Sequence, residues 1–153
     1  IDKKLPKRSE ELVKLFLLPN YYEYIDTVVN LVPQNTKVIS TKSPWMSDAK
    51  AGEIYTVPIS HGEGRFIASP QQVLEFNKTG QIATQYVDFD GIASMDSRFN
   101  PNQSVAAIEG IYSPDGRVFG KMAHSERCGA GISQNIPGQL EMPIFTSGVK
   151  YFK

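Results

Sequence analysis

The chain contains very few of the residues that build metal centres or disulfide frameworks. Its 153 residues include one cysteine and two histidines. A single cysteine excludes a disulfide within the chain and is typical of proteins from a reducing compartment, so we expect a cytoplasmic protein. Because structural zinc sites need several nitrogen and sulfur ligands, we expect no metal site in this chain.

The chain also lacks an excess of charge of either sign and lacks long apolar runs. Sixteen basic residues balance sixteen acidic ones, which gives a formal net charge of zero. The one basic cluster, at residues 3–8, is offset by Glu10 and Glu11. Nucleic acids attract clustered positive charge, so we expect no nucleic-acid partner. No apolar stretch approaches the ~20 residues of a membrane span and the first residues show no signal-peptide pattern, so we expect no membrane partner.

The chain does contain alternating helical and extended patterns. We expect residues 1–153 to form a single domain, since domains of ~100–200 residues are usual. Apolar periodicity and turn residues predict helices at 9–18, 69–80 and 143–152, and strands at 27–32, 36–41, 53–60, 81–88, 105–113 and 117–122. This order indicates an α/β fold with a mixed sheet, and a layered α+β arrangement is the alternative.

Four short segments have local signals that sharpen these boundaries. Ser69-Pro70-Gln71-Gln72 combines an N-cap serine, a first-turn proline and a capping-box glutamine, so it predicts a helix start. Pro114-Asp115-Gly116 predicts a tight turn that joins the last two strands into an antiparallel hairpin. Pro33-Gln34-Asn35 predicts a turn between two earlier strands. Lys42–Ser47 predicts a loop, with Trp45 as an aromatic anchor.

The most informative segment is Lys121–Arg127, which follows the predicted hairpin and contains His124 and Glu126. Residues at i and i+2 point to the same side of an extended backbone, so these two side chains are expected to converge at a strand end. A carboxylate that holds an imidazole in one tautomer is what a serine or cysteine nucleophile requires from its base and orienting acid. The pair is therefore a candidate catalytic dyad. The alternative is a solvated strand edge.

A second polar cluster, His61-Gly-Glu63-Gly-Arg65, directly follows the predicted strand at 53–60. Its two glycines allow a sharp turn or a close approach of the backbone to a ligand. His61, Glu63 and Arg65 are therefore candidates for substrate binding or for contact with a neighbouring domain. In the alternative interpretation the glycines only form a turn and the charges are solvated.

The only cysteine, Cys128, lies four residues after His124. A nucleophile and its base usually come from different elements that the fold brings together, so this spacing favours an incidental cysteine. An independent hydrolase that uses Cys128 with His124 and Glu126 is the alternative.

Several segments together resemble the C-terminal glutaminase domain of phosphoribosylformylglycinamidine synthase, an enzyme of purine biosynthesis. They occur in the family's order: Pro58-Ile-Ser-His-Gly-Glu-Gly-Arg-Phe66, Gly80-Gln-Ile-Ala-Thr-Gln-Tyr-Val-Asp88, Asn100-Pro-Asn-Gln-Ser104 and Ser113-Pro-Asp-Gly-Arg-Val-Phe-Gly-Lys-Met-Ala-His-Ser-Glu-Arg127. Lys42-Ser-Pro-Trp45 also fits the long bacterial form. The resemblance covers about residues 36–153, whereas residues 1–35 match poorly.

This resemblance implies a triad-type (class I) glutamine amidotransferase with a flavodoxin-like fold, of which the chain is the C-terminal part. In that family a cysteine attacks the glutamine amide and ammonia passes to a synthetase domain of the same enzyme. The synthetase uses ATP and Mg²⁺ to convert formylglycinamide ribonucleotide to its amidine, and the glutaminase segment itself needs no cofactor. The family's His-x-Glu pair falls on His124 and Glu126. By resemblance, His124 acts as base and then acid, and Glu126 orients it.

The resemblance also predicts what this chain lacks. The family's nucleophile lies in a Gly-x-Cys-Asn-Gly-Phe-Gln segment, and the corresponding stretch here is Lys4–Glu10, with Pro6 near the cysteine position. We therefore expect the chain alone to be inactive toward glutamine. A non-catalytic interaction or regulatory module derived from the same domain is the alternative function.

Overall fold

The computed structural model describes residues 33–60, 64–129, 131–132 and 135–153. Within these ranges the chain forms five strands, two α-helices and three short 3-10 turns. The strands are β1 (Gln34–Val38), β2 (Ile54–Val57), β3 (Ile82–Tyr86), β4 (Ile108–Tyr112) and β5 (Phe119–Lys121). The helices are α3 (Pro70–Lys78) and α4 (Ile144–Tyr151), and the 3-10 turns are η1 (Pro44–Met46), η2 (Val105–Ala107) and η3 (Ser125–Arg127).

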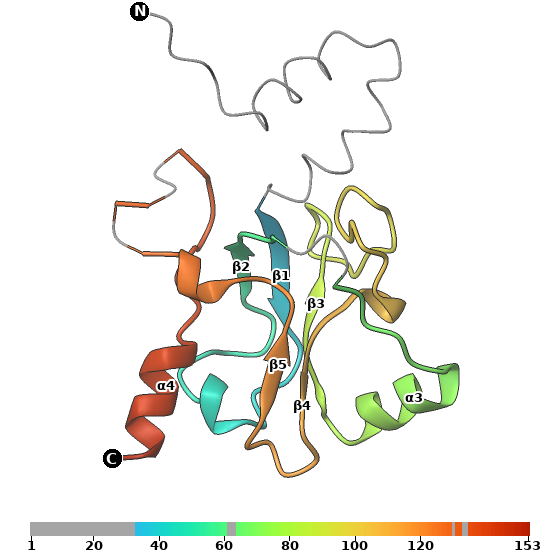
Figure 1. Cartoon of the computed structure of the whole chain (residues 1–153), viewed down its shortest axis with the longest axis horizontal. Coiled ribbons are helices and arrows are strands. Elements are labelled where there is room, and N and C mark those ends of the chain that lie inside the picture. Colours follow the sequence, from blue (N-terminus) through green and yellow to red (C-terminus); the bar gives the residue numbers. More distant parts are fainter. Residues whose placement is uncertain (1–32, 61–63, 130, 133–134) are drawn as a thin grey trace, which may run out of the picture.

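The five strands form one sheet in the order β2-β1-β3-β4-β5, with every neighbouring pair antiparallel. The sheet lies between α4 on one side and α3 on the other (Figure 1). This arrangement confirms the predicted α/β fold and the antiparallel hairpin, which is β4–β5. The strands that the structure describes contain no parallel pair, so within these residues the sheet is antiparallel and not mixed as expected.

The sheet curls, so that the segments following its two edge strands meet. His124 follows β5 and Pro58 follows β2, and the His124 N–H donates a hydrogen bond of 2.8 Å to the Pro58 carbonyl. Segments 66 residues apart in sequence are thereby joined next to the candidate dyad.

Three buried tyrosines, Tyr55, Tyr86 and Tyr112, are the largest side chains of the core. They pack with smaller apolar residues that include Val38, Met46, Val57, Ile59 and Ala83. Burial raises the pKa of all three phenols well above the ordinary value. The hydroxyl of Tyr112 remains satisfied because it donates to the Ser40 carbonyl at 2.8 Å.

Local signals in the sequence locate α3 and the hairpin turn correctly. Ser69 Oγ accepts from the Gln72 N–H at 3.3 Å, and the Ser69 N–H donates to Gln72 Oε1 at 2.8 Å, which is the predicted capping box. Gly116 has a φ of 74°, which side-chained residues resist and the predicted turn requires. Both predictions are confirmed.

The predicted turn at Pro33-Gln34-Asn35 is wrong. Gln34 and Asn35 belong to β1, where they pair with Val57 and Thr56 of β2. The Thr56 hydroxyl donates to Asn35 Oδ1 at 3.0 Å, so the asparagine side chain finds a partner across the strands instead of within a turn. The predicted helix at 9–18 and strand at 27–32 lie outside the described residues.

The first part of the strand predicted at 105–113 is also wrong, because Val105–Ala107 form the 3-10 turn η2. Ala106 and Ala107 have φ values of 52° and 55°, which are incompatible with an extended strand. The strand β4 therefore begins only at Ile108.

The helix predicted at 143–152 is confirmed as α4, and the aromatic anchor predicted in the 42–47 segment packs against it. A Cβ atom added to Gly148 would lie 2.5 Å from the Trp45 ring, so the helix backbone approaches the indole closely. The indole Nε1 donates to the Arg117 carbonyl at 2.7 Å. Trp45 thus joins α4 to the loop of the β4–β5 hairpin. In the part of the chain that the structure describes, no helix has the length and apolar character needed to cross a membrane.

Candidate functional site

The side chains of His124 and Glu126 meet after β5. His124 Nδ1 and Glu126 Oε1 are 2.6 Å apart, and the two side chains are 29% and 56% exposed. The predicted convergence is confirmed, but the local structure differs from the expected strand end. His124 immediately precedes η3, and its carbonyl accepts from the Arg127 N–H at 3.1 Å. A 3-10 turn therefore brings the carboxylate to the imidazole.

This hydrogen bond determines what the imidazole can do. A carboxylate accepts but does not donate, so it favours the tautomer of His124 that carries its proton on Nδ1. In that tautomer Nε2 has a lone pair and can take a proton from a nucleophile. The pair therefore has the chemistry of a general base and its orienting acid.

Several opposing effects act on the Glu126 carboxyl. Partial burial raises its pKa, but the hydrogen bond from His124, a backbone N–H and the positive charges nearby lower it by more in total. The pKa of Glu126 therefore lies below its ordinary value. Glu126 stays ionised at neutral pH, as a residue that stabilises an imidazolium must.

The dyad borders a small groove of about 290 Å³ between β5, η3 and α4. Trp45, Phe119 and Ile144 form part of its apolar wall, beside His124 and Glu126. Small-molecule sites usually combine an apolar lining with a few polar groups, and this groove has that composition.

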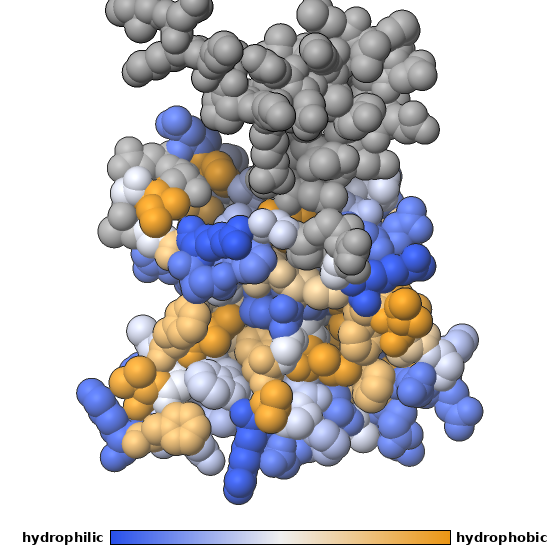
Figure 2. All heavy atoms as spheres, in the orientation of Figure 1, coloured by the Kyte–Doolittle hydropathy of each residue, from blue (hydrophilic) through white to orange (hydrophobic). Residues whose placement is uncertain are grey.

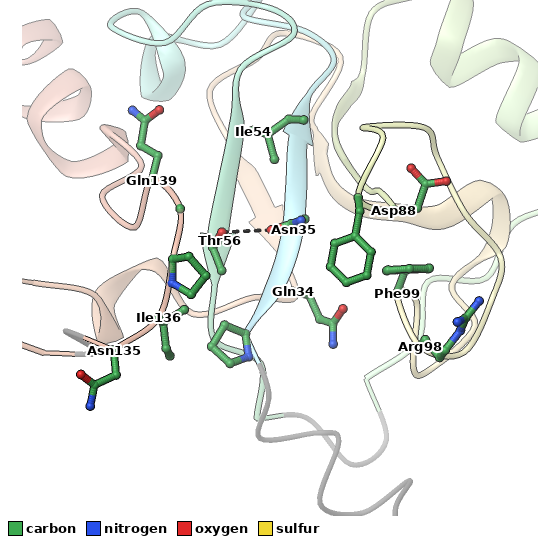
Figure 3. Close-up of a pocket in the computed structure, with 14 residues that line it drawn as sticks. Gln34, Asn35, Ile54, Thr56, Asp88, Arg98, Phe99, Asn135, Ile136 and Gln139 are labelled. Carbon is green, nitrogen blue, oxygen red and sulfur yellow. Dashed lines mark hydrogen bonds between the residues drawn. The ribbon is translucent and has the colours of Figure 1, made fainter.

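A larger groove, of about 690 Å³, lies elsewhere, between β1, β2, the loop after β3 and residues 135–139 (Figure 3). Its labelled polar side chains include Gln34, Asn35 and Arg98, and a hydrogen bond joins two of its lining residues, Asn35 and Thr56, between neighbouring strands. Neither His124 nor Glu126 lines this groove. The candidate dyad lines the smaller groove, whereas the ionisable side chains of the larger groove are Asp88 and Arg98.

Of the second predicted cluster, His61 and Glu63 lie outside the described residues. Arg65 is described and its side chain is exposed. No hydrogen bond or ion pair joins Arg65 to the dyad within the described ranges. A role for these three residues in substrate binding or at an interface therefore remains a prediction.

Two of the family-like segments are nevertheless held together. Asn102 Nδ2 donates to the Gly64 carbonyl at 2.7 Å. The Phe66 N–H donates to Ser104 Oγ at 3.1 Å, and the Val105 N–H donates to the Phe66 carbonyl at 3.0 Å. The segment at 58–66 thus contacts the 100–105 loop at one end and His124 at the other.

Cys128 has the opposite properties to those of a catalytic thiol. Burial and the negative charges of Glu126 and Glu141 raise the pKa of its thiol, and Lys121 only partly opposes them. Nucleophilic cysteines instead have a lowered pKa and a nearby base. Within the described residues no hydrogen bond joins the Cys128 side chain to His124. The geometry does not favour a Cys128 hydrolase.

Sequence reasoning missed two residues that support the site, Glu109 and Lys121. Glu109 lies in β4 and is 2% exposed, and its Oε1 is 3.1 Å from Lys121 Nζ in β5. The signal was a charged residue within the otherwise apolar strand Ile108–Tyr112. A lone carboxylate in a strand does not reveal its partners, so the pattern alone could not identify the pair.

Comparison with known proteins gives one family. The model of the CobB/CobQ-like glutamine amidotransferase domain matches residues 10–152. A protein named phosphoribosylformylglycinamidine synthase subunit PurQ from Thermomicrobium roseum is 40% identical over 91 residues, which are 60% of this chain and 38% of the relative. The protein of the same name from Methanosarcina barkeri is 32% identical over 117 residues, which are 76% of this chain and 48% of the relative.

A solved structure gives the same family resemblance. The chain is similar to one in the structure of PurLQS from Thermotoga maritima, with a TM-score of 0.56 and 25% identity, covering 79% of this chain and 47% of that chain. The chain thus spans less than half the length of each of these proteins.

Proposed function

This chain belongs to the CobB/CobQ-like glutamine amidotransferase domain family, and on that premise we propose that it forms part of the glutaminase of a phosphoribosylformylglycinamidine synthase. The observation that carries the proposal is the 2.6 Å contact between His124 Nδ1 and Glu126 Oε1. It provides a base and an orienting carboxylate within the range that the family model matches. The identity to PurQ proteins, 40% and 32% over the matched residues, supports the same function.

In the proposed reaction, His124 Nε2 takes the proton of a cysteine thiol while the sulfur bonds to the side-chain amide carbon of glutamine. The imidazolium then returns the proton to the amide nitrogen, so the C–N bond breaks and ammonia leaves. Water next gives a proton to His124 and attacks the thioester, which releases glutamate. The imidazolium finally reprotonates the leaving sulfur and so restores the thiol. Glu126 stabilises the imidazolium in both halves of the cycle.

We assign the nucleophile to a cysteine that is not among these 153 residues. The raised pKa of Cys128 and its position four residues after the base both oppose a nucleophilic role. The proposal therefore includes that this chain alone releases no ammonia from glutamine. Removing the nucleophile from a catalytic triad lowers turnover by about 10⁶-fold in a well-studied protease.

The proposed partners are glutamine, as substrate, and the synthetase component that receives the ammonia. ATP and Mg²⁺ act in the synthetase, and we assign no residue of this chain to them. Within the described ranges, no three His, Cys, Asp or Glu side chains gather where they could hold a metal ion. We also propose a cytoplasmic location, which the single cysteine supports.

The exposed apolar side of α4 favours a second candidate function, a non-catalytic interaction module. Phe145, Val149 and Phe152 are 55%, 55% and 73% exposed, and apolar side chains gather over α4 in Figure 2. Such a module would bind a synthetase without ever supporting glutamine hydrolysis. An intact His124–Glu126 pair has no use in that function, so we rank it second.

The test compares two nitrogen sources in the complete enzyme that contains this segment. We expect His124→Ala to abolish synthesis from glutamine and to leave synthesis from added ammonium salt unchanged, because the synthetase site does not need the dyad. Glu75→Gln, on exposed α3, is the control and should retain both activities. A His124→Ala enzyme that uses glutamine at the normal rate refutes the proposal, and equal loss of both activities does so as well.

A further inference from the structure

Glu109 is the only buried Asp, Glu, Lys or Arg residue in the described part of the chain. Its side chain is 0% exposed, and that of its partner Lys121 is 11% exposed. A buried carboxylate carries a large desolvation cost that only close hydrogen-bonded partners offset. A pair of this kind is weak support for stability by itself, since apolar residues of the same volume often serve as well. The role of the pair therefore depends on the backbone groups that Glu109 and Lys121 bind.

Most of the groups that surround the Glu109 carboxylate belong to three consecutive residues. Its Oε1 accepts from the Met122 N–H at 3.2 Å and from the Ala123 N–H at 2.7 Å. The same oxygen is 3.1 Å from Lys121 Nζ. Its other oxygen accepts from the Thr84 hydroxyl of β3. The Met122 N–H also donates to the backbone carbonyl of Glu109 at 3.0 Å, so the side chain of Glu109 binds mainly Lys121 and Ala123.

Lys121 closes this network from the other direction. Its Nζ donates to the Ala123 carbonyl at 2.7 Å. Lys121 therefore binds the carbonyl of Ala123, and Glu109 binds the N–H of the same residue. The next N–H, of His124 itself, donates to Pro58. The backbone before the imidazole is held at three successive polar groups.

We propose that Glu109, together with Lys121, is a positioning residue for the glutaminase reaction, which it serves by fixing the backbone that carries His124 and Glu126. This inference rests on the proposed function. Among the described residues no hydrogen bond or ion pair joins Glu109 or Lys121 to the dyad side chains, although Lys121 lines the same groove, so we infer that both act through the backbone. An ionised carboxylate accepts several hydrogen bonds at once and donates none, so no neutral side chain can replace all of these contacts. Small misplacement of a catalytic group lowers turnover strongly.

A positioning role of Glu109 and Lys121 can be distinguished from a purely structural one, because a double variant removes both charges together. Glu109→Gln alone leaves the Lys121 ammonium buried without its partner, so we expect this variant to be less stable and less active. The double variant Glu109→Gln/Lys121→Met has no unpaired charge and nearly the same volume. We expect its urea midpoint to lie clearly above that of Glu109→Gln alone, because no charge is left buried without a partner.

The decisive readout is the turnover of the double variant in the complete enzyme. We expect kcat for glutamine to fall by about tenfold or more with a smaller change in KM, because the base is displaced, whereas of the residues that line the groove only Lys121 is replaced. Synthesis from ammonium salt should be unchanged. Glu75→Gln is the matched carboxylate control and should retain the normal kcat.

Each outcome distinguishes the two proposals. A double variant with normal stability and normal kcat overturns the positioning role, whereas the glutaminase assignment then still depends on His124→Ala. If His124→Ala retains normal glutamine use, the proposed function itself fails. A double variant whose glutamine and ammonium activities fall together also overturns the positioning role, because the effect is then not specific to the dyad.

Discussion

On one side of the sheet α3 is held by hydrogen bonds between near neighbours in the sequence, whereas on the other side α4 is held by residues about a hundred positions away (Figure 1). The capping box joins Ser69 to Gln72, and α3 has no buried residue. In contrast, the Asp48 N–H donates to Ser147 Oγ of α4 at 3.1 Å, and Asp48 pairs with Lys150 at 2.8 Å.

The dyad lies on the side with distant contacts. His124 bonds to Pro58, and Ile144 of α4 lines the same groove as His124. A substitution near α4 or the β4–β5 hairpin should therefore disturb the site, while one in α3 should change only its own helix. The following predictions test this difference, beginning with the largest effect.

Gly110→Ala should destabilise the chain most. A Cβ at this position in β4 would meet the Thr84 hydroxyl and would lie 2.9 Å from the Phe119 ring. Overpacking of this kind costs about 1–3 kcal/mol. Urea unfolding followed by the fluorescence of Trp45, the only tryptophan, measures the loss. The control is Gly120→Ala in β5, where an added Cβ meets nothing within 4 Å. Equal midpoints for the two variants would contradict the close packing at Gly110.

Gly148→Ala should change the free energy of unfolding less, because overpacking against Trp45 and the higher helix propensity of alanine oppose each other. The new methyl would lie 2.5 Å from the Trp45 ring, which costs about 1–3 kcal/mol. Alanine gains about 1 kcal/mol over glycine inside a helix, so we expect a net loss of about 0–2 kcal/mol. The indole must move, so the emission of Trp45 should shift. An unshifted emission with higher stability would show that α4 does not press on the indole.

Ser69→Ala should weaken only α3. Loss of an N-cap costs about 1 kcal/mol of helix stability, and because α3 has no buried residue the helix can fray locally. We expect faster amide exchange in residues 70–78, with glutamine-dependent activity of the complete enzyme unchanged. Reduced glutamine use in this variant would contradict the claim that α3 is independent of the dyad.

The smallest effect concerns the exposed pair formed by Asp96 and Arg98. Hydrogen bonds from Arg98 lower the pKa of Asp96 to about 2. A lowered carboxyl pKa stabilises the folded state above the ordinary pKa, and this contribution disappears as the pH falls toward 2. An NMR titration of the Asp96 carboxyl should give this low midpoint, and Asp96→Asn should leave stability at pH 7 nearly unchanged, since exposed pairs contribute little. A midpoint near 3.8 would show that the pair does not persist in solution.

The same contrast explains which features the sequence could predict. The start of α3 and the turn at Gly116 were predicted correctly because their signals are contained within a few residues. The convergence of His124 and Glu126 was predicted for the same reason, although the backbone proved to be a 3-10 turn. Because the two residues are separated by only one position, their side chains lie close together in either backbone conformation.

Several features that depend on distant partners were missed or wrong. Gln34 and Asn35 have turn propensity, but pairing with β2 gives them hydrogen bonds that a turn would not. Glu109 gave no sign of its role, because its partners in β3 and after β5 are up to 25 residues away. Local propensity is a weak guide wherever tertiary pairing competes with it.

The central claim is that Glu126 orients His124 as the base of a glutaminase, and Glu126→Gln in the complete enzyme tests it most directly. Glutamine keeps the size of the side chain but loses the charge that stabilises the imidazolium and favours the Nδ1–H tautomer. We predict that kcat for glutamine falls by about 10²–10⁴-fold while the rate with ammonium salt is unchanged. A Glu126→Gln enzyme with the normal kcat for glutamine would contradict the account.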